Sequence, residues 1–188
     1  MLVAFFERFN LFTADEIAAI VALFHPRSLF KNDFLIREGE YCEEIGFVES
    51  GLFRSFYSTD GGSELTYCFR FPGDLIGAYS AFITQGKSIE HIQAIAPARL
   101  WVIQKKDLDY LACQLPQWNT FLKVIAEEQY LELEQRVMQL QRETAQHRYK
   151  NLLLNHPNFI QTIPLQYLAS YLGITQRHLS RIRKEISF

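Results

Sequence analysis

Three basic residues near the end of the chain have a spacing that would place them on one face of a helix. Arg177, Arg181 and Lys184 are separated by four and three positions, and residues three or four apart are neighbours on a helix surface. Gln176 and Ser180 flank them. A guanidinium can donate two hydrogen bonds to guanine, and a glutamine amide can bond adenine in the same way. The chemistry predicted for this face is therefore the reading of base edges in DNA.

The segment that carries these residues is typical of a helix-turn-helix. Pro164 suits the first turn of a helix, Gly173 suits the left-handed position that ends one, and Thr175 suits the cap of the next. Ala169 is small where two helices would cross. The shared core is predicted to contain Leu168, Leu172, Ile174, Leu179 and Ile182. A plain helical hairpin would need the same core residues but not the basic outward face.

The residues expected to contact DNA follow from this orientation. The start of a recognition helix lies nearest the base edges. We therefore predict that Gln176, Arg177 and Arg181 contact bases. The predicted DNA-binding set also contains residues for phosphate contact or capping and the flanking serine, namely Thr175, Arg183, Lys184 and Ser180.

The charge distribution agrees with a nucleic-acid-binding end. Residues 142–188 contain seven Lys or Arg and two Glu, a net +5, whereas the overall net charge of −2 leaves −7 on the first 141 residues. A basic end behind an acidic body is expected of a DNA-binding module. Chance clustering of solvated charges would give the same asymmetry.

The first half of the chain shows strand periodicity between residues 28 and 103. Short apolar or alternating runs occur at 34–36, 45–48, 52–58, 64–70, 75–76, 89–95 and 99–103. Turn residues separate them, and Asp60-Gly61 is expected to form a hairpin turn at positive φ. Many short antiparallel strands predict a sandwich, jelly roll or small barrel. Five aromatic residues are expected to fill it, namely Tyr67, Phe69, Tyr79, Phe82 and Trp101.

Helices are predicted on both sides of the strand region. A capping box from Thr13 to Glu16 begins a helix over 14–24. Residues 117–143 contain no Gly or Pro, and their apolar side chains predict one long stripe. Its members are Trp118, Phe121, Leu122, Ile125, Leu133, Val137 and Leu140. A helix of this length exceeds what one small β-domain can cover, so we expect it to pair with a second copy. A further helix is expected over 145–154.

The cysteine and histidine patterns exclude several kinds of site. The three cysteines are far apart in sequence, without metal-ligand spacing, and are expected to be buried thiols in a reducing cytosol. His91 stands alone in a predicted strand, which disfavours a cupin-like enzyme. No apolar run approaches the roughly 20 residues that a membrane span needs. We expect a soluble cytoplasmic protein that is not an enzyme, with no metal, no cofactor and no membrane partner.

The motifs together resemble the Crp/Fnr family. The sensor half contains Arg37-Glu38-Gly39-Glu40, the run from Ile45 to Gly51, and the run from Phe71 to Gly77. With the helix-turn-helix, the resemblance covers nearly the whole chain. It implies an α+β fold with an N-terminal cyclic-nucleotide-binding-like β-roll (jelly roll), a long dimerisation helix and a C-terminal helix-turn-helix. The implied domains are a sensor over 1–115, a dimerisation helix over 116–143 and a DNA-binding domain over 144–188.

Two departures from the family pattern qualify the function that it implies. Relatives that bind cyclic nucleotides hold the ribose with Glu and the phosphate with Arg, but the aligned positions here are Ala78 and Ser88. The site for cyclic nucleotides is therefore expected to be lost, and the sequence does not identify another effector. The sequence ends at Phe188, directly after the predicted recognition helix. The β-hairpin that forms the wing of a winged helix is therefore expected to be truncated.

The expected function is a dimeric, sequence-specific DNA-binding transcription regulator that does not respond to cyclic nucleotides. Its expected partners are a near-palindromic operator in double-stranded DNA, a second copy of the chain and, by resemblance, RNA polymerase. The alternative is a dimeric β-roll sensor or adaptor that has lost DNA binding. The shared basic face of Arg177, Arg181 and Lys184 favours the first interpretation.

Overall fold

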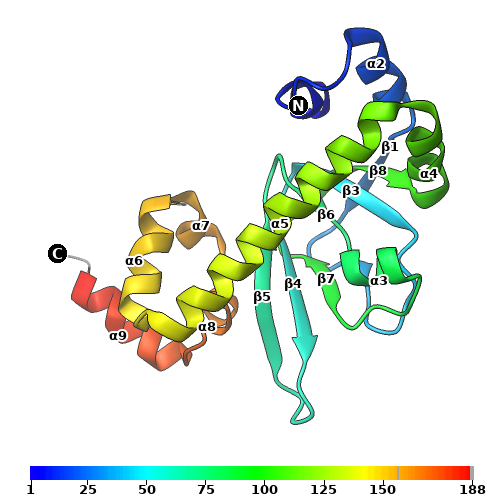
Figure 1. The fold of residues 1–188 in the computed structure, drawn as a ribbon. Coiled ribbons are helices and arrows are strands. Elements are labelled where there is room, and N and C mark those ends of the chain that lie inside the picture. The colour runs from blue at the N-terminus through cyan, green and yellow to red at the C-terminus, as the bar shows by residue number, and fades with distance from the viewer. Residues whose placement is uncertain (156, 187–188) are drawn as a thin grey trace. The chain divides into compact units, whose positions relative to one another are not determined.

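The computed structural model of the chain describes residues 1–155 and 157–186. These residues form two units (Figure 1). The first unit contains residues 1–57 and 68–125, and the second contains residues 58–67 and 126–188. The long helix α5 (Pro116–Arg142) begins in the first unit and ends in the second.

The strands of the chain form two four-stranded antiparallel sheets. One has the order β1-β8-β3-β6 and the other β2-β7-β4-β5. Their bounds are β1 His25–Leu29, β2 Phe34–Ile36, β3 Glu44–Ser50, β4 Phe53–Ser58, β5 Glu64–Arg70, β6 Leu75–Ile76, β7 His91–Ala94 and β8 Ala98–Gln104. The predicted β-roll is confirmed. The turn between β4 and β5 and the first half of β5, residues 58–67, belong to the second unit.

The core between the sheets is aliphatic with two phenylalanines. Val48 and Leu100 come from the first sheet, and Phe53 and Ile92 from the second. Each of these four is at most 1% exposed. The turn after β3 is fixed by Gly51 at φ +99, where an added Cβ would lie 2.5 Å from the Cβ of Ala98. Only glycine fits such a close approach with positive φ.

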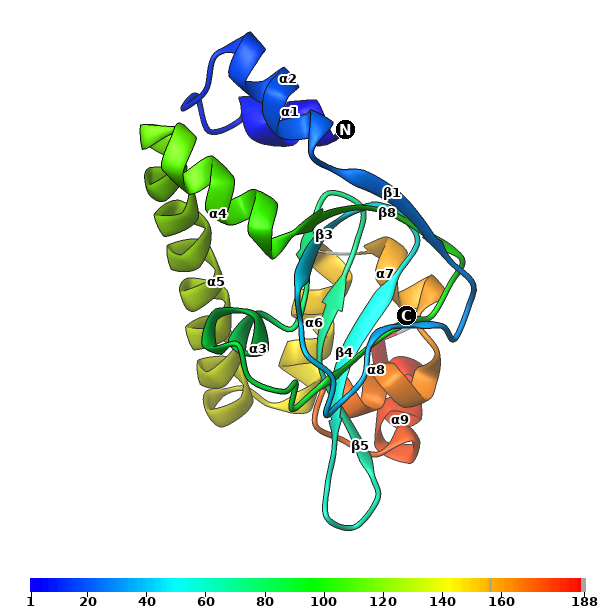
Figure 2. The ribbon, with the colours of Figure 1, turned by 90° about the vertical axis from the view of Figure 1, so that its right-hand side faces the viewer.

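Helices cover the other face of the first sheet. They are α1 (Leu2–Glu7), α2 (Ala14–Ala22), α4 (Lys105–Gln114), which follows β8 directly (Figure 2), and the beginning of α5. The predicted capping box is present in α2, with the Glu16 amide donating to Thr13 Oγ1 at 3.3 Å and the Thr13 amide donating to Glu16 Oε2 at 2.7 Å. Phe6, Phe47 and Trp118 form the buried centre of this second core.

The structure corrects the predicted single stripe on the long helix. Trp118 and Phe121 are buried in the first unit's helical core, and Ile125 packs against it. Leu133, Val137 and Leu140 are exposed at 55%, 49% and 44%. The stripe divides because positions 118, 121 and 125 lie at a different angle around the helix from positions 133, 137 and 140.

Three further expectations were wrong in detail. The hairpin between β4 and β5 forms, but its positive φ is at Gly62 rather than at Asp60 or Gly61. Cys42 and Cys68 are buried, whereas Cys113 is exposed because it lies near the end of α4. Among the five aromatic residues, Tyr79 is 42% exposed. Trp101 packs against the helical core, and its Nε1 donates to Glu49 at 3.0 Å.

The part of the second unit beyond α5 is helical. It contains α6 (Ala145–Asn155), α7 (Pro157–Thr162), α8 (Leu165–Tyr171) and α9 (Gln176–Ile186). The predicted helix over 145–154 is confirmed, and α7 is an addition to the prediction. Tyr149 of α6 and Ile163, which precedes α8, are also buried.

Candidate nucleic-acid interface

The turn between α8 and α9 has the geometry that its sequence predicts. Gly173 has φ +69, and the Ile174 amide donates to the carbonyl of Ala169 at 3.0 Å. This bond from beyond the glycine back into the helix is characteristic of a helix ended by a left-handed residue. Thr175 caps α9, because its Oγ1 accepts from the His178 amide at 3.2 Å.

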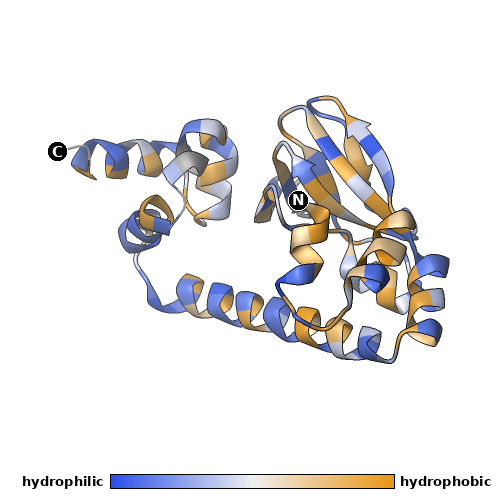
Figure 3. Cartoon of the chain, turned by 90° about the horizontal axis from the view of Figure 1, so that it is seen from above, coloured by the Kyte–Doolittle hydropathy of each residue, from blue (hydrophilic) through white to orange (hydrophobic). Residues whose placement is uncertain are grey.

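The core between α8 and α9 fixes which side of α9 is outward. Leu168, Leu172, Leu179 and Ile182 are at most 3% exposed. With Leu179 and Ile182 inward, the residues on the opposite side of a helix must face outward. Figure 3 shows α9, beside the C-terminal mark, coloured mostly hydrophilic.

The predicted contact residues lie on and beside this outward face. Arg177, Arg181 and Lys184 are all exposed. Ser180 is half-buried beside them, and the remaining members of the predicted set, Thr175, Gln176 and Arg183, are exposed. Arg183 and Lys184 lie in the last turn of α9, where cations are favoured by the helix dipole. The structure thus brings the set together on one short helix with cationic and amide donors.

Sequence reasoning missed two arginines that contact the end of α8. Arg136 of α5 donates to the carbonyl of Tyr171, and its guanidinium carbon lies 3.8 Å from the centre of the Tyr171 ring. Arg148 of α6 donates to the carbonyl of Leu172 at 2.8 Å. Each pair is more than twenty positions apart in sequence, so no local pattern could reveal it.

The positions aligned with a cyclic-nucleotide site have other roles in the first unit. Ala78 is completely buried in the core between the sheets. Ser88 is 2% exposed, and its hydroxyl donates to the Glu90 carbonyl at 2.7 Å and accepts from the Glu90 amide at 3.2 Å. Glu90 itself is 7% exposed. A neutral serine cannot neutralise an anionic phosphate.

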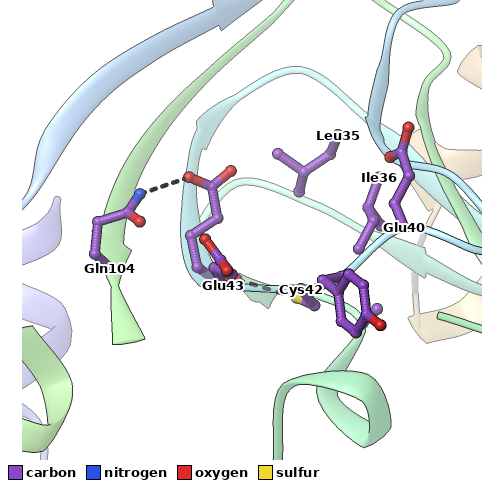
Figure 4. A pocket seen from close by; sticks show the side chains of 10 residues that line it. Leu35, Ile36, Glu40, Cys42, Glu43 and Gln104 are labelled. Carbon is purple, nitrogen blue, oxygen red and sulfur yellow. Dashed lines mark hydrogen bonds between the residues drawn. The ribbon is translucent and has the colours of Figure 1, made fainter. Parts of the chain in front are cut away.

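A pocket between the β2–β3 loop and the residues after β6 is lined mostly by acidic and apolar side chains (Figure 4). Glu44 in this pocket is paired, since Gln104 Nε2 donates to it at 2.9 Å and Arg27 forms a bidentate ion pair with it. The Cys42 thiol donates to the Glu44 carbonyl at 3.3 Å. Burial raises the pKa of the Cys42 thiol. The pocket therefore offers no cation for an anionic ligand among its lining residues.

His91 has a structural role in the same unit. Its ring stacks on Phe56 with centroids 4.9 Å apart. Its Nδ1 accepts from the Glu38 amide at 3.2 Å, and its Nε2 lies 3.4 Å from the Glu38 carboxylate. Among the described residues, no group of three His, Cys, Asp or Glu could hold a metal. In the same part of the chain, no helix is long and apolar enough to cross a membrane.

Comparisons with known proteins agree with the fold. Residues 26–113 match the family described as the cyclic nucleotide-binding domain. Transcriptional activator protein Anr of Pseudomonas protegens is 29% identical over 177 residues, which are 94% of this chain and 68% of that protein. Transcriptional activator protein FnrA of Stutzerimonas stutzeri is 28% identical over 167 residues, which are 83% of this chain and 68% of that protein.

Solved structures share the fold at lower sequence identity. FixK2 from Bradyrhizobium japonicum has a TM-score of 0.76 at 21% identity, and the match covers 87% of this chain and 84% of that one. The Catabolite Activator Protein of Thermus thermophilus has a TM-score of 0.60 at 21% identity, covering 93% and 84%. A β-roll followed by a helix-turn-helix defines a class of transcription regulators. This chain is similar to regulators of the Crp/Fnr type, in sequence over most of its length and in fold.

These similarities confirm the predicted resemblance and fold class. The curated relatives are transcription regulators and not enzymes, so the cupin-like enzyme alternative is set aside.

Proposed function

We propose that the protein is a dimeric transcription regulator that binds a specific, near-palindromic DNA sequence through α9. The observation that carries this proposal is the exposed face of Arg177, Arg181 and Lys184, held outward by the buried Leu179 and Ile182. The description of the relatives as transcriptional activators supports it.

Each residue of the face has a proposed role. Gln176 and Arg177 begin α9, Arg181 lies one turn further along, and these three side chains contact base edges in the major groove. The phosphate-contacting residues are Thr175, Arg183 and Lys184, and Ser180 lies between the two sets. The Thr175 side chain already accepts a backbone hydrogen bond, which leaves its hydroxyl hydrogen for a phosphate oxygen.

The second half of α5 is the proposed dimer interface. Its exposed apolar side chains, including Leu133, Val137 and Leu140, recur at the spacing of a coiled-coil seam. A second copy of the same helix would cover them with the same side chains. We accordingly divide the chain into a sensor over 1–115, a dimerisation helix over 116–143 and a DNA-binding domain over 144–188.

The proposed regulator works without cyclic nucleotides. Ala78 cannot accept a hydrogen bond from a ribose hydroxyl, and the buried Ser88 hydroxyl is already bonded to the backbone of Glu90. RNA polymerase in the cytoplasm is the proposed further partner, because the curated relatives are bacterial transcriptional activators.

The test is selection of bound sequences from a pool of random duplex DNA, followed by mobility shifts with the enriched site. The wild type should enrich a near-palindrome. The double variant Arg177→Ala with Arg181→Ala should lose this preference, whereas Arg99→Ala, which removes an exposed cation from β8, should keep it. Failure of the dimeric wild type to enrich any sequence would favour the adaptor alternative.

A further inference from the structure

A single arginine lies at the junction of three helices in the second unit. Arg148 is in the first turn of α6, where it donates to the carbonyl of Leu172 at the end of α8 at 2.8 Å. It also donates to the carbonyls of Gln139 and Glu143 at the end of α5. One guanidinium therefore caps the C-terminal ends of both α5 and α8.

The electrostatics explain why this position carries an arginine. The last carbonyls of a helix have no partner within the helix and carry partial negative charge. A cation in the first turn of α6 is unfavourable for that helix's own dipole. The carbonyls of α5 and α8 compensate for this cost, and a planar guanidinium with five N–H donors can bond both sets at once.

Neighbouring contacts also connect the end of α8 to α5 and α6. An added Cβ at Gly173 would lie 3.6 Å from Leu140 and 3.9 Å from the Arg148 guanidinium, so the helix-turn-helix turn rests against the end of α5. Arg136, about two turns before the end of α5, donates to the carbonyl of Tyr171 and stacks over its ring. The last two carbonyls before the turn are thus both held by arginines from other helices.

We propose that Arg148, supported by Arg136, is a positioning residue that sets the orientation of α9 relative to α5. This inference rests on the proposed function. If two copies pair along α5, the orientation of α9 relative to α5 determines the separation of the two recognition helices. It thereby determines the spacing of the DNA half-sites that one dimer can bind.

The experiment keeps the half-site sequence constant and varies only the spacer between the two copies. We expect the wild type to lose about tenfold or more in affinity when the spacer changes by one base pair, because one half-site must give up base contacts. Arg148→Ala should reduce this loss to about threefold or less while enriching the same half-site from a random pool. Arg148→Lys, with one nitrogen in place of the fork, should fall between them.

Controls separate positioning from loss of folding. Arg142→Ala removes an exposed cation from the last turn of α5 and should keep the spacing preference. Far-ultraviolet circular dichroism should show native helix content in every variant at the assay temperature. If Arg148→Ala does not fold, the folded Arg148→Lys protein and Arg136→Ala provide the same comparison.

The possible failures are distinguishable. A wild type that selects no sequence would overturn the proposed function and this inference with it. A wild type with a sharp spacing preference that folded Arg148 and Arg136 variants all retain would overturn this inference alone. A change in the half-site sequence itself would mean that Arg148 affects base reading rather than spacing, and would also contradict the inference.

Discussion

The hydroxyl of Ser170 and the backbone amide of Thr66 are joined by a hydrogen bond of 2.9 Å. The same hydroxyl donates to the carbonyl of Glu64 at 3.1 Å. Ser170 belongs to α8, and Thr66 and Glu64 belong to β5, more than one hundred positions earlier in the chain. One side chain thus bonds two successive outward-pointing groups of a strand edge, as a neighbouring strand would.

Substitution Ser170→Ala tests the strength of this contact. The Thr66 amide and the Glu64 carbonyl would lose a partner, so the free energy of unfolding of the second unit should fall by about 1 kcal/mol. Hydrogen exchange should become faster at the Thr66 amide. Ser80→Ala, at an exposed serine of α3 (Tyr79–Thr84), is the matched control. Unchanged exchange at Thr66 would show that the contact has no energetic importance.

Charges placed on the exposed half of α5 should prevent dimer formation. Leu133→Glu together with Val137→Glu places four carboxylates in one interface of the proposed dimer, where burial without partners is costly. Sedimentation velocity should then show monomers, and affinity for the selected DNA should fall sharply. Gln135→Glu, at an exposed position of the same helix, should remain dimeric. Leu140 is avoided because it lies against Gly173. Monomeric wild type at micromolar concentration would refute the interface.

Cyclic AMP and cyclic GMP should not bind at physiological concentrations. The buried Ala78 and the internally bonded Ser88 stand where a carboxylate and a guanidinium would be required. Without the guanidinium, the desolvation of the phosphate has no compensation. Isothermal titration calorimetry on the full chain should give no heat beyond dilution. A micromolar dissociation constant for either nucleotide would contradict this reading of the site.

The Cys42 thiol should make stability fall at alkaline pH. Burial raises its pKa, so the folded state retains the proton where the unfolded state releases it. The corresponding stability is present below the ordinary thiol pKa and is lost as pH rises toward and through the folded pKa. The free energy of unfolding, measured with denaturant between about pH 8 and 10, should therefore fall less steeply with pH for Cys42→Ala than for wild type.

Cys113→Ala is the control for this pH effect, because Cys113 is exposed. Its unfolding should follow the wild-type pH dependence. In the native protein, a thiol reagent should modify Cys113 well before Cys42, since the reagent requires both access and the thiolate form. Equal pH dependence in Cys42→Ala and wild type would show that another group dominates in this range.

Arg181 and Lys184 should differ in what their loss does to DNA binding. Arg181→Ala should cost about 1–3 kcal/mol per half-site and relax the preference at one base pair. Lys184→Ala should weaken specific and non-specific binding alike and reduce the salt dependence by about one ion per subunit. Affinities at several salt concentrations distinguish the two effects. The reverse result, a changed sequence preference with Lys184→Ala only, would mean that α9 enters the groove in another orientation.

Local signals were sufficient for much of the fold. The long helix was predicted within one residue at each end because Pro116 begins it and no breaker follows. The helix-turn-helix was predicted because Gly173 and Thr175 mark its turn chemically. The outward face of α9 followed from those two landmarks and the apolar spacing alone.

Elements without such signals were missed. Strand β1 contains Pro26, which disfavours a strand in general but is tolerated at an edge, and β1 is the edge of its sheet. Helix α3 is short and has no side-chain cap. The contacts of Arg136 and Arg148 depend on carbonyls that tertiary folding brings to them. No periodicity in the sequence encodes such partners.

Both tryptophans of the chain lie in the first unit, Trp101 on β8 and Trp118 in the helical core. Intrinsic tryptophan emission therefore reports on that unit directly. Trp118 is 1% exposed, with its ring centroid 5.0 Å from that of Phe121, so its fluorescence should shift to longer wavelength only when the aromatic core opens. Melting of α6 to α9 would change the helical dichroism without this shift. Denaturation curves that differ between the two probes would then measure the separate unfolding of the second unit.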